Sequence, residues 1–500
     1  MAGAPSGGRR PGGTVRGQAG SGGGVPGQGP GTGGCHNEPV PHFLSASPDA
    51  NLIPLPWGVP LADWPQDLLV PLPRGLSRHV VRFIRVGTSV YAAKELIEHA
   101  ALHEYRMLQD LHRLDTPAVE PVAVVTDRTN AAGASLDPIL LTRHLEFSLP
   151  YRSLFYSGVR QETVSRLLDA LVVLLVRLHL AGVLWGDVSL SNVLFRRDAG
   201  EFAAYLVDAE TGELHERLSN GQRRHDLDIA TTNLFGEFCD LESGRLLDAS
   251  LDPAALVAQI NERYDALWDE LTGVEVFGGD ELHRIERRVR RLNTLGFDVA
   301  ELEVTTAPDG SSIRIQPKVV DAGHHSRRLL RLTGLDVEEN QARRLLNDLD
   351  TYRWRTNQQH VGEAIVAHQW LRDSFESVVR AIPPELTGKR DPAQIYHEVL
   401  DYRWYASQRV DHEVPLHDAV QGYINDILRA LPDEAMSAEL PSVAGHGRAG
   451  LGGPDEPTEP DEEEAPYDPW EAGASDPDTE LLPDFLDIAA LRRKAAKKDA

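Results

Sequence analysis

The sequence predicts an α+β protein that begins with strand-rich segments and continues into a mostly helical region with one β-hairpin. Two observations predict this class. Residues 79–96 alternate and are rich in β-branched and aromatic side chains, as is typical of strands, and residues 119–127 and 137–145 look like further strands. Apolar residues follow the 3.6-residue helical period over residues 162–182, and the pattern stays mostly helical from about 222 to 435.

The first elements follow one another in a simple order. "HVVRFIRVGTSVYAAKEL" (79–96) is expected to form two strands joined around Gly87, and residues 96–114 are expected to form a helix. Residues 119–127 and 137–145 are predicted to be further strands. The predicted order is therefore strand, strand, helix, strand, strand.

A long apolar helix is predicted next, and Gly182 is a fitting stop for it. "NVLFRRDAGEFAAYLVDAE" is predicted to be a hairpin that turns at 197–201, and its second strand ends in Asp208. In the helical part, "VAELEVTTAPDGSSIRIQPKVV" predicts one more hairpin, which turns at Asp309 and Gly310.

Charge and cysteine content exclude several classes of protein. The net charge is -26, and residues 455–487 carry fourteen acidic and no basic side chains. An acidic body makes nucleic-acid binding a poor expectation, because such binding depends on clustered Lys and Arg. Cys35 and Cys239 cannot form a disulfide framework and do not suggest a zinc site, so we expect a reducing, cytoplasmic compartment.

No transmembrane segment is expected. "LLDALVVLLVRLHLAGVLW" is the most apolar stretch, but Asp169, Arg177 and His179 interrupt it well short of the roughly 20 apolar residues that a span needs. The N-terminal segment is rich in Gly and Pro and has no apolar core, which indicates a flexible arm rather than a signal peptide.

A short polar loop directly after the long helix is the first candidate site. In "LHLAGVLWGDVSLSNVLF" (178–195), Asp187 and Asn192 separate two apolar elements. A turn would explain them as well, since Asp and Asn favour turns. The spacing therefore gains weight only if other residues at matching distances supply the rest of a chemistry.

Lys94 and an acidic partner are the second candidate. The chain has 44 Arg and six Lys, and Lys94, at the end of a predicted strand, is its only Lys before position 318. A compact ammonium on a flexible stem suits a nucleotide phosphate, although a surface lysine would be the simpler explanation. Glu104 on the following helix is the expected partner, and Glu95 and Glu98 are rivals.

Together these residues match the needs of phosphoryl transfer, namely a cation on the phosphates, oxygen ligands for Mg²⁺ and a group that orients the acceptor hydroxyl. Asp187 is the candidate catalytic residue that orients the acceptor. Asn192 and Asp208 are the candidate metal ligands, since Mg²⁺ prefers oxygen ligands together with substrate phosphates. Lys94 and Glu104 are expected to bind ATP, and the order of the elements is that of a two-lobed, protein-kinase-like fold.

Residues from about 80 to 240 resemble the protein-kinase-like superfamily, especially its bacterial branch that contains lipopolysaccharide kinases. "YAAKE" resembles the strand with the phosphate-binding lysine, "WGDVSLSN" the catalytic loop, and "VDAE" the metal-binding D-F-G position. The whole chain is also similar to an uncharacterised bacterial family, the domain of unknown function 4032, in which such a region precedes a helical one. The resemblance implies ATP and Mg²⁺ as cofactors.

Several positions depart from the kinase pattern. Trp185 stands where the loop usually has His, Ser189 where protein kinases have Lys, and Glu210 where D-F-G has Gly, so that Glu210 is a further candidate metal contact. No G-x-G-x-x-G is present, and "PRGLSRHVVRF" with Gly75 is the substitute. These departures argue against an ordinary Ser/Thr protein kinase and leave the acceptor open.

Two other features are interpreted as structural. The adjacent pair His324 and His325 lacks further ligands at metal-binding spacing, so it indicates a helix start rather than a metal site. Asp226 or Asp228, in "RRHDLDIATTNLFGE", is expected to support the backbone of the catalytic loop.

Five domains are predicted: a disordered arm, a kinase-like N-lobe, a C-lobe core, a mostly helical domain and an acidic disordered tail with a short terminal helix, at residues 1–42, 43–145, 146–249, 250–435 and 436–500. Two functions are compatible with them. One is a phosphotransferase acting on a hydroxyl of a small molecule, glycan, lipid or protein. The other is a pseudokinase that acts as a nucleotide-binding scaffold, with a protein partner for the helical domain or the tail.

Overall fold

The computed structural model describes residues 41–46, 49–72, 79–156, 160–278, 283–306, 312–410 and 412–435. Four predicted features lie outside these residues: most of the N-terminal arm, the segment around Gly75, the turn at Asp309 and Gly310, and the acidic tail with its terminal helix.

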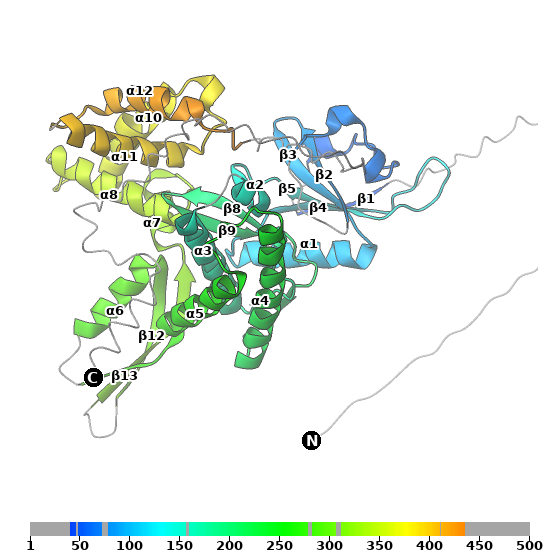
Figure 1. Ribbon diagram of the computed structural model, residues 1–500, viewed down its shortest axis with the longest axis horizontal. Coiled ribbons are helices and arrows are strands. Elements are labelled where there is room, and N and C mark those ends of the chain that lie inside the picture. The colour runs from blue at the N-terminus through cyan, green and yellow to red at the C-terminus, as the bar shows by residue number, and fades with distance from the viewer. Residues whose placement is uncertain are drawn as a thin grey trace, which may run out of the picture. The chain divides into compact units, whose positions relative to one another are not determined.

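The first lobe is a five-stranded antiparallel sheet with one helix against it (Figure 1). Its strand order is β1-β4-β5-β3-β2. The bounds are His42–Leu44 for β1, Val80–Val86 for β2, Ser89–Glu95 for β3, Glu98–Arg113 for α1, Pro121–Thr126 for β4 and Ile139–Arg143 for β5.

The alternating sequence explains how this sheet is packed. Gly87 has φ +62° in the tight turn between β2 and β3, where a residue without Cβ is favoured. On one face, Ile84, Ala93 and Leu141 pack into an apolar cluster with Trp57 and Trp64 of the preceding segment. The opposite face packs on α1, whose buried side includes Glu104.

The second lobe is built on the apolar helix α3, Gln161–Leu180. Eleven of its side chains are buried, which explains its composition without a membrane. Among the described residues, no helix combines the length and the apolar character that crossing a membrane requires. Gly182, just after the helix, has φ +82°, and a Cβ there would lie 2.2 Å from the His215 carbonyl oxygen.

Short strands and two long helices complete the second lobe. The hairpin of β8 and β9 pairs with β6, and β7 pairs with β10. The bounds are Ser148–Pro150 for β6, Tyr151–Tyr156 for α2, Val183–Leu184 for β7, Val193–Asp198 for β8, Glu201–Leu206 for β9, Glu213–Leu214 for β10, Asn220–Ser243 for α4 and Pro253–Thr272 for α5.

The rest of the chain is a small sheet followed by a helical region that we define as residues 324–435. The sheet has the order β11-β13-β12, and the helical region has an apolar core of its own. The bounds are Glu275–Gly278 for β11, His283–Thr294 for α6, Phe297–Thr306 for β12, Ser312–Ala322 for β13, His324–Thr333 for α7, Glu339–Arg355 for α8, Glu363–Trp370 for α9, Glu376–Ala381 for α10, Pro392–Val410 for α11 and Leu416–Asp426 for α12.

The predicted fold class is confirmed, with a two-lobed first part and a helical last part. The strands around Gly87, the helix after them, the long apolar helix and both hairpins are present. The third strand of the small sheet, β11, was not predicted, because its four residues are too short to show a period. His324 begins α7, as expected for a helix start. The domain bounds stay predictions.

Candidate active site

Lys94 lies at the junction of the two lobes, near the end of β3. Its Nζ is 3.0 Å from Glu104 Oε2 and 2.7 Å from Asp208 Oδ2. Burial by itself would lower the pKa of Lys94, but the charges of the two carboxylates outweigh it and raise that pKa. The structure thus brings together three of the residues that the sequence singled out.

Glu104 is the acidic partner of Lys94, whereas the two alternatives, Glu95 and Glu98, are not. It is 1% exposed on the inner face of α1, whereas Glu98 is exposed and Glu95 pairs with Arg128 at 2.8 Å. Burial, together with the charge of Asp208, raises the pKa of Glu104 to about 7, although Lys94 opposes the shift. The site therefore holds more negative charge than one ammonium can neutralise.

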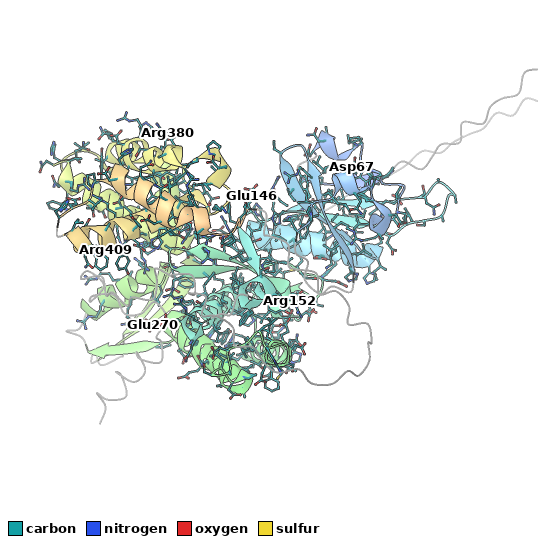
Figure 2. All side chains as sticks on the ribbon, turned by 45° about the horizontal axis from the view of Figure 1, so that its top comes forward. Asp67, Glu146, Arg152, Glu270, Arg380 and Arg409 are labelled. Carbon is teal, nitrogen blue, oxygen red and sulfur yellow. The ribbon has the colours of Figure 1, made fainter. Side chains whose placement is uncertain are left out.

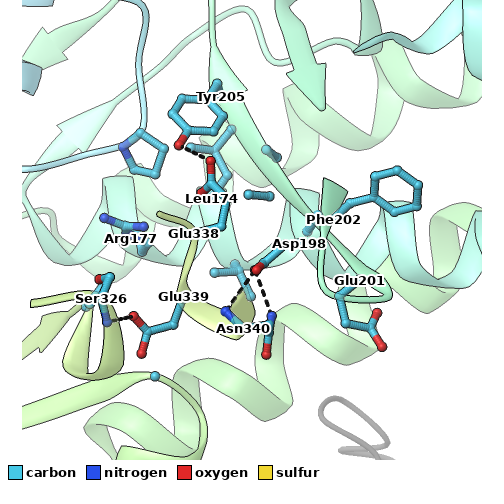
Figure 3. A pocket seen from close by; sticks show the side chains of 18 of the residues that line it. Leu174, Arg177, Asp198, Glu201, Phe202, Tyr205, Ser326, Glu338, Glu339 and Asn340 are labelled. Atoms are coloured by element: carbon cyan, nitrogen blue, oxygen red, sulfur yellow. Dashed lines mark hydrogen bonds between the residues drawn. The ribbon is translucent and has the colours of Figure 1, made fainter. Parts of the chain in front are cut away.

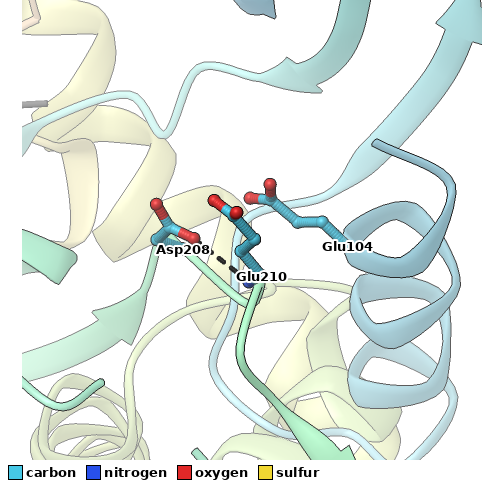
Figure 4. Close-up of side chains that lie close together, drawn as sticks. All are labelled: Glu104, Asp208 and Glu210. Atoms are coloured by element: carbon cyan, nitrogen blue, oxygen red, sulfur yellow. Dashed lines mark hydrogen bonds between the residues drawn. The ribbon is translucent and has the colours of Figure 1, made fainter. Parts of the chain in front are cut away.

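Three carboxylates converge at this point, as Figure 4 shows: Glu104, Asp208 and Glu210. Each offers an oxygen atom, and these atoms lie within 4.8 Å of one another. Glu210 also pairs with His79 at 3.0 Å and lies 3.8 Å from Lys94 Nζ. A surplus of carboxylate oxygens around one cation fits the donor set that Mg²⁺ prefers.

Asp187 and Asn192 lie on the loop that faces this cluster across a cavity. Asn192 Nδ2 donates to the Asp187 carbonyl oxygen at 3.0 Å and to its Oδ2 at 3.3 Å. Because the amide nitrogen is engaged with Asp187, the amide oxygen points away from it. Among the described residues that oxygen accepts no hydrogen bond, so it is available as a metal ligand. The turn-forming explanation for these residues is incomplete, since both also line the cavity.

The cavity between the lobes has a volume of about 280 Å³ and contains all five candidate residues. Its apolar walls come from both lobes: Val81, Ala92, Val119, Leu140, Leu194 and Val207. Ser189 and Arg152 line it on the second lobe. Arg152 lies on α2 (Figure 2), and its Nε is buried without a hydrogen-bond partner among the described residues.

The comparison with family models gives two matches. Residues 81–233 match the lipopolysaccharide kinase (Kdo/WaaP) family, and residues 266–428 match the domain of unknown function 4032. Residues 81–233 are a lipopolysaccharide-kinase-like region. The matched range contains every candidate site residue, and both matches agree with the resemblance seen in the sequence.

The remaining comparisons add little. A solved structure described as "WaaP in complex with acyl carrier protein" is 16% identical, and the similarity covers 41% of this chain and 90% of that chain. Its TM-score of 0.27 is too low to support a structural argument. The comparison with curated proteins found no match.

Within the kinase-like region, α4 holds the backbone of the candidate catalytic loop. Asp226 is fully buried and accepts from the Trp185 and Gly186 backbone N–H groups at 3.0 and 2.7 Å, and it lies 3.0 Å from His179 Nε2. Burial would raise the pKa of Asp226, but these partners lower it overall. The expected support by Asp226 is present, whereas Asp228 is exposed.

Trp185, which replaces the usual His, connects the loop to the segment that carries Asp208. Its indole Nε1 donates to the Asp208 carbonyl oxygen at 2.8 Å, and its own carbonyl oxygen accepts from Thr211 Oγ1 at 2.8 Å. The side chain is 1% exposed. Trp185 therefore fixes the loop relative to residues 208–211 by two hydrogen bonds, one with Asp208 and one with Thr211.

Two further supports on α4 were missed in the sequence. Asn233 Nδ2 donates to Asp187 Oδ1 at 3.3 Å and to the Val188 carbonyl oxygen at 3.1 Å. Glu237 accepts from the Leu190 and Ser191 backbone N–H groups at 2.6 and 3.1 Å. These two residues follow Asp226 by seven and eleven positions, a spacing that places all three on one face of a helix and could have revealed them.

His324 and His325 are not part of a metal cluster among the described residues. Glu339 accepts from the His325 and Ser326 backbone N–H groups at 2.7 and 3.0 Å, and from the His325 ring at 2.7 Å. The pair therefore serves the start of α7, as its sequence context indicated.

Proposed function

We propose that this chain is an ATP- and Mg²⁺-dependent phosphotransferase that acts on a hydroxyl group of an acceptor molecule. The observation that carries the proposal is the position of Lys94, bonded to Glu104 and Asp208 on one side of a cavity that also contains Asp187 and Asn192. Catalysis of phosphoryl transfer depends mainly on positioning the reactants and on stabilising the charge of the phosphoryl group, and these residues are suited to both.

The cavity suits a nucleotide. Its apolar walls fit a flat aromatic base, and its polar end holds the Lys94 ammonium, which would bind phosphate oxygens. A volume of about 280 Å³ lies near the lower end of the range for ligand pockets, roughly 300 Å³.

Asn192 and Asp208 are the residues that would hold Mg²⁺, and Glu210 is placed to assist. The fit rests on the surplus of carboxylates around Lys94 and on the amide oxygen that Asn192 directs away from Asp187. Bound Mg²⁺ would neutralise charge on the phosphates. Lys94 would then divide its hydrogen bonds between Glu104 and the nucleotide.

Asp187 would accept the proton of the attacking hydroxyl. Asn192 and Asn233 each donate a hydrogen bond to its carboxylate at 3.3 Å, which orients the group. Arg152 offers a positive charge in the cavity, at a site where the loop itself has Ser189 instead of Lys. A small molecule, glycan, lipid or protein hydroxyl would each be compatible with this chemistry.

One observation favours a second function, a nucleotide-binding scaffold that transfers no phosphate. Ser189 lines the cavity and carries no charge to steady a phosphoryl group in transit. If Arg152 does not replace that charge, binding would persist and transfer would fail.

Substitutions of the two aspartates separate these functions. Asp208→Asn should weaken Mg²⁺-dependent binding of ATP, because it removes a charged ligand. Asp187→Asn should leave ATP binding intact and slow the loss of γ-phosphate from labelled ATP about a hundredfold or more.

The measurement is ATP turnover beside ATP binding, with circular dichroism to confirm folding. Equal turnover by wild type and Asp187→Asn, with both binding ATP, would exclude Asp187 as a catalytic residue and leave the scaffold. If Asp187→Asn unfolds the protein, Asp187 has a structural role in the turn instead.

A further inference from the structure

The β8–β9 hairpin carries the two proposed metal ligands at its base. Asn192 immediately precedes β8, and Asp208 follows the last residue of β9 by two positions. The Val207 backbone N–H donates to the Asn192 carbonyl oxygen at 3.0 Å, which closes the base, and Val193 is paired with Leu206. Any tilt of the paired strands would therefore move both ligands together.

The tip of this hairpin is bonded to the start of α8, the second helix of the helical region. Asp198, the last residue of β8, is 3% exposed. Its Oδ2 accepts from the Asn340 backbone N–H at 3.1 Å and from Asn340 Nδ2 at 2.8 Å (Figure 3). Its Oδ1 accepts from the Gln341 backbone N–H at 2.7 Å. A carboxylate at a helix N-terminus satisfies N–H groups that have no partner within the helix.

Neighbouring residues of the tip form hydrogen bonds with α11 and with the segment that ends the same region. The Ala199 backbone N–H, in the turn, donates to Gln394 Oε1 on α11 at 3.0 Å. Arg197 Nε donates to Glu434 at 3.0 Å, and Glu434 pairs with Arg390 at 2.9 Å. From the kinase-like region, Arg166 on α3 also reaches the turn, at the carbonyl oxygen of Gly200.

Both strands of the hairpin make one further contact each with the helical region. Arg196 of β8 and Tyr205 of β9 both bond to Glu338, the N-cap residue of α8, at 2.9 and 2.7 Å. Hydrogen bonds in buried surroundings are directional and costly to leave unmade, so this contact fixes the hairpin in one position. The helical region also has its own apolar core, which makes it a firm support.

We infer that the helical region positions the metal ligands of the kinase-like site by holding the tip of the β8–β9 hairpin. This gives residues 324–435 a function of their own, and its link to Mg²⁺ rests on the proposed function. Asp198, Asn340 and Gln394 are positioning residues, because they act through the hairpin and not on a substrate.

The competing explanation is that these contacts only attach the helical region. Attachment alone predicts a lower melting temperature when a contact is lost, with no effect at the base of the hairpin. Positioning predicts a change at the base, where backbone hydrogen exchange and the Mg²⁺ requirement report on the strands and their ligands.

The experiment compares Asp198→Asn with Asp348→Asn in the full chain. Asp348 also lies on α8 and accepts two hydrogen bonds, from Trp370 Nε1 and the Tyr396 hydroxyl, both at 2.7 Å and both within the helical region. It is a matched control, since it weakens the same region without touching the hairpin. Asn340→Ala, which removes one of the three bonds to Asp198, replaces Asp198→Asn if that variant does not fold.

We expect Asp198→Asn to speed deuterium exchange in peptides covering residues 193–208 about tenfold, whereas Asp348→Asn leaves those peptides unchanged. Asp198→Asn should also raise the Mg²⁺ concentration needed for half of the thermal shift with ATP by about tenfold. Unchanged exchange in residues 193–208 would overturn the inference, and so would faster exchange with an unchanged Mg²⁺ requirement. If wild type shows no shift with Mg²⁺ and ATP, the proposed function fails and the inferred link to Mg²⁺ fails with it, while the exchange result alone still decides whether the tip is held.

Discussion

Lys94 faces more negative charge than it can balance, and this imbalance defines the chemistry of the site. Its ammonium lies 3.0 Å from Glu104, 2.7 Å from Asp208 and 3.8 Å from Glu210. Charges this close interact strongly where water is scarce, so an additional cation would be attracted to the same oxygens. This excess of carboxylates around Lys94 is a reason to expect a metal ion beside the nucleotide.

His144, which also lines the cavity, gives a prediction for the dependence of stability on pH. Burial lowers the pKa of His144 to about 4 from its ordinary value of 6.5. Below pH 6.5 His144 becomes protonated in the unfolded chain but stays neutral in the folded protein. The free energy of unfolding therefore falls as the pH drops from 6.5 toward 4. We expect a loss of about 1–2 kcal/mol at pH 4.5, allowing for partial exposure of the ring.

Melting temperatures of wild type and His144→Gln between pH 4 and 7.5 test this prediction. The neutral Gln cannot take up a proton, so its curve should fall less steeply on the acid side than that of wild type. Parallel curves over the whole range would mean that His144 titrates normally in the folded protein.

Among the elements, the candidate catalytic loop depends on a tight approach between two backbone segments. Gly182, at the start of the loop, has φ +82°, and a Cβ at this position would meet the His215 carbonyl oxygen at 2.2 Å. Gly87, in the turn between β2 and β3, has φ +62° but no atom within 4 Å of its hypothetical Cβ. The two glycines share their backbone region and differ in available space.

Gly182→Ala should therefore destabilise the protein by about 2–4 kcal/mol, because backbone strain and a steric clash add together. Gly87→Ala, the matched control, should cost only about 1 kcal/mol, from strain alone. Urea unfolding of both variants measures the difference. Equal losses would show that the β10 segment around His215 moves aside at little cost.

The sequence was informative where a pattern is local. The alternation in residues 79–96 and the helical period in residues 162–182 are set by neighbours a few positions apart, and both elements formed as predicted. Lys94, Glu104 and Asp208 could be proposed as a set because each lies on or directly after a recognisable element. Their approach to within hydrogen-bond distance depends on how the lobes pack, which no local pattern encodes.

The residues that support the site were harder to predict, because their partners are also distant in the sequence. Asn233 and Glu237 act on loop residues more than forty positions away, and a polar face on a helix usually indicates exposure to water. The sequence predicts that Asp198 is part of a turn. Nothing in the adjacent sequence indicates a hydrogen bond with Asn340, which lies 142 positions further along the chain. Long-range polar contacts of this kind appear only in the folded chain.

For the molecule as a whole, the two regions matched by family models are joined through polar contacts at the hairpin. The kinase-like region contains every proposed site residue, and the helical region contacts the strands that lead to two of them. This arrangement predicts that nucleotide binding depends on the complete chain and not on residues 81–233 alone.

The thermal shift of the purified chain with ATP, in the presence and in the absence of Mg²⁺, measures whether the protein binds a nucleotide together with a metal ion. A ligand that binds only the folded state raises the free energy of unfolding by about 2.7 kcal/mol at a hundredfold excess over its dissociation constant. We predict a melting temperature that rises with ATP in the presence of Mg²⁺, a much smaller rise in EDTA, and a strongly reduced rise in folded Lys94→Met. An unchanged melting temperature of the wild type at millimolar ATP and Mg²⁺ would contradict the phosphotransferase and the nucleotide-binding scaffold alike.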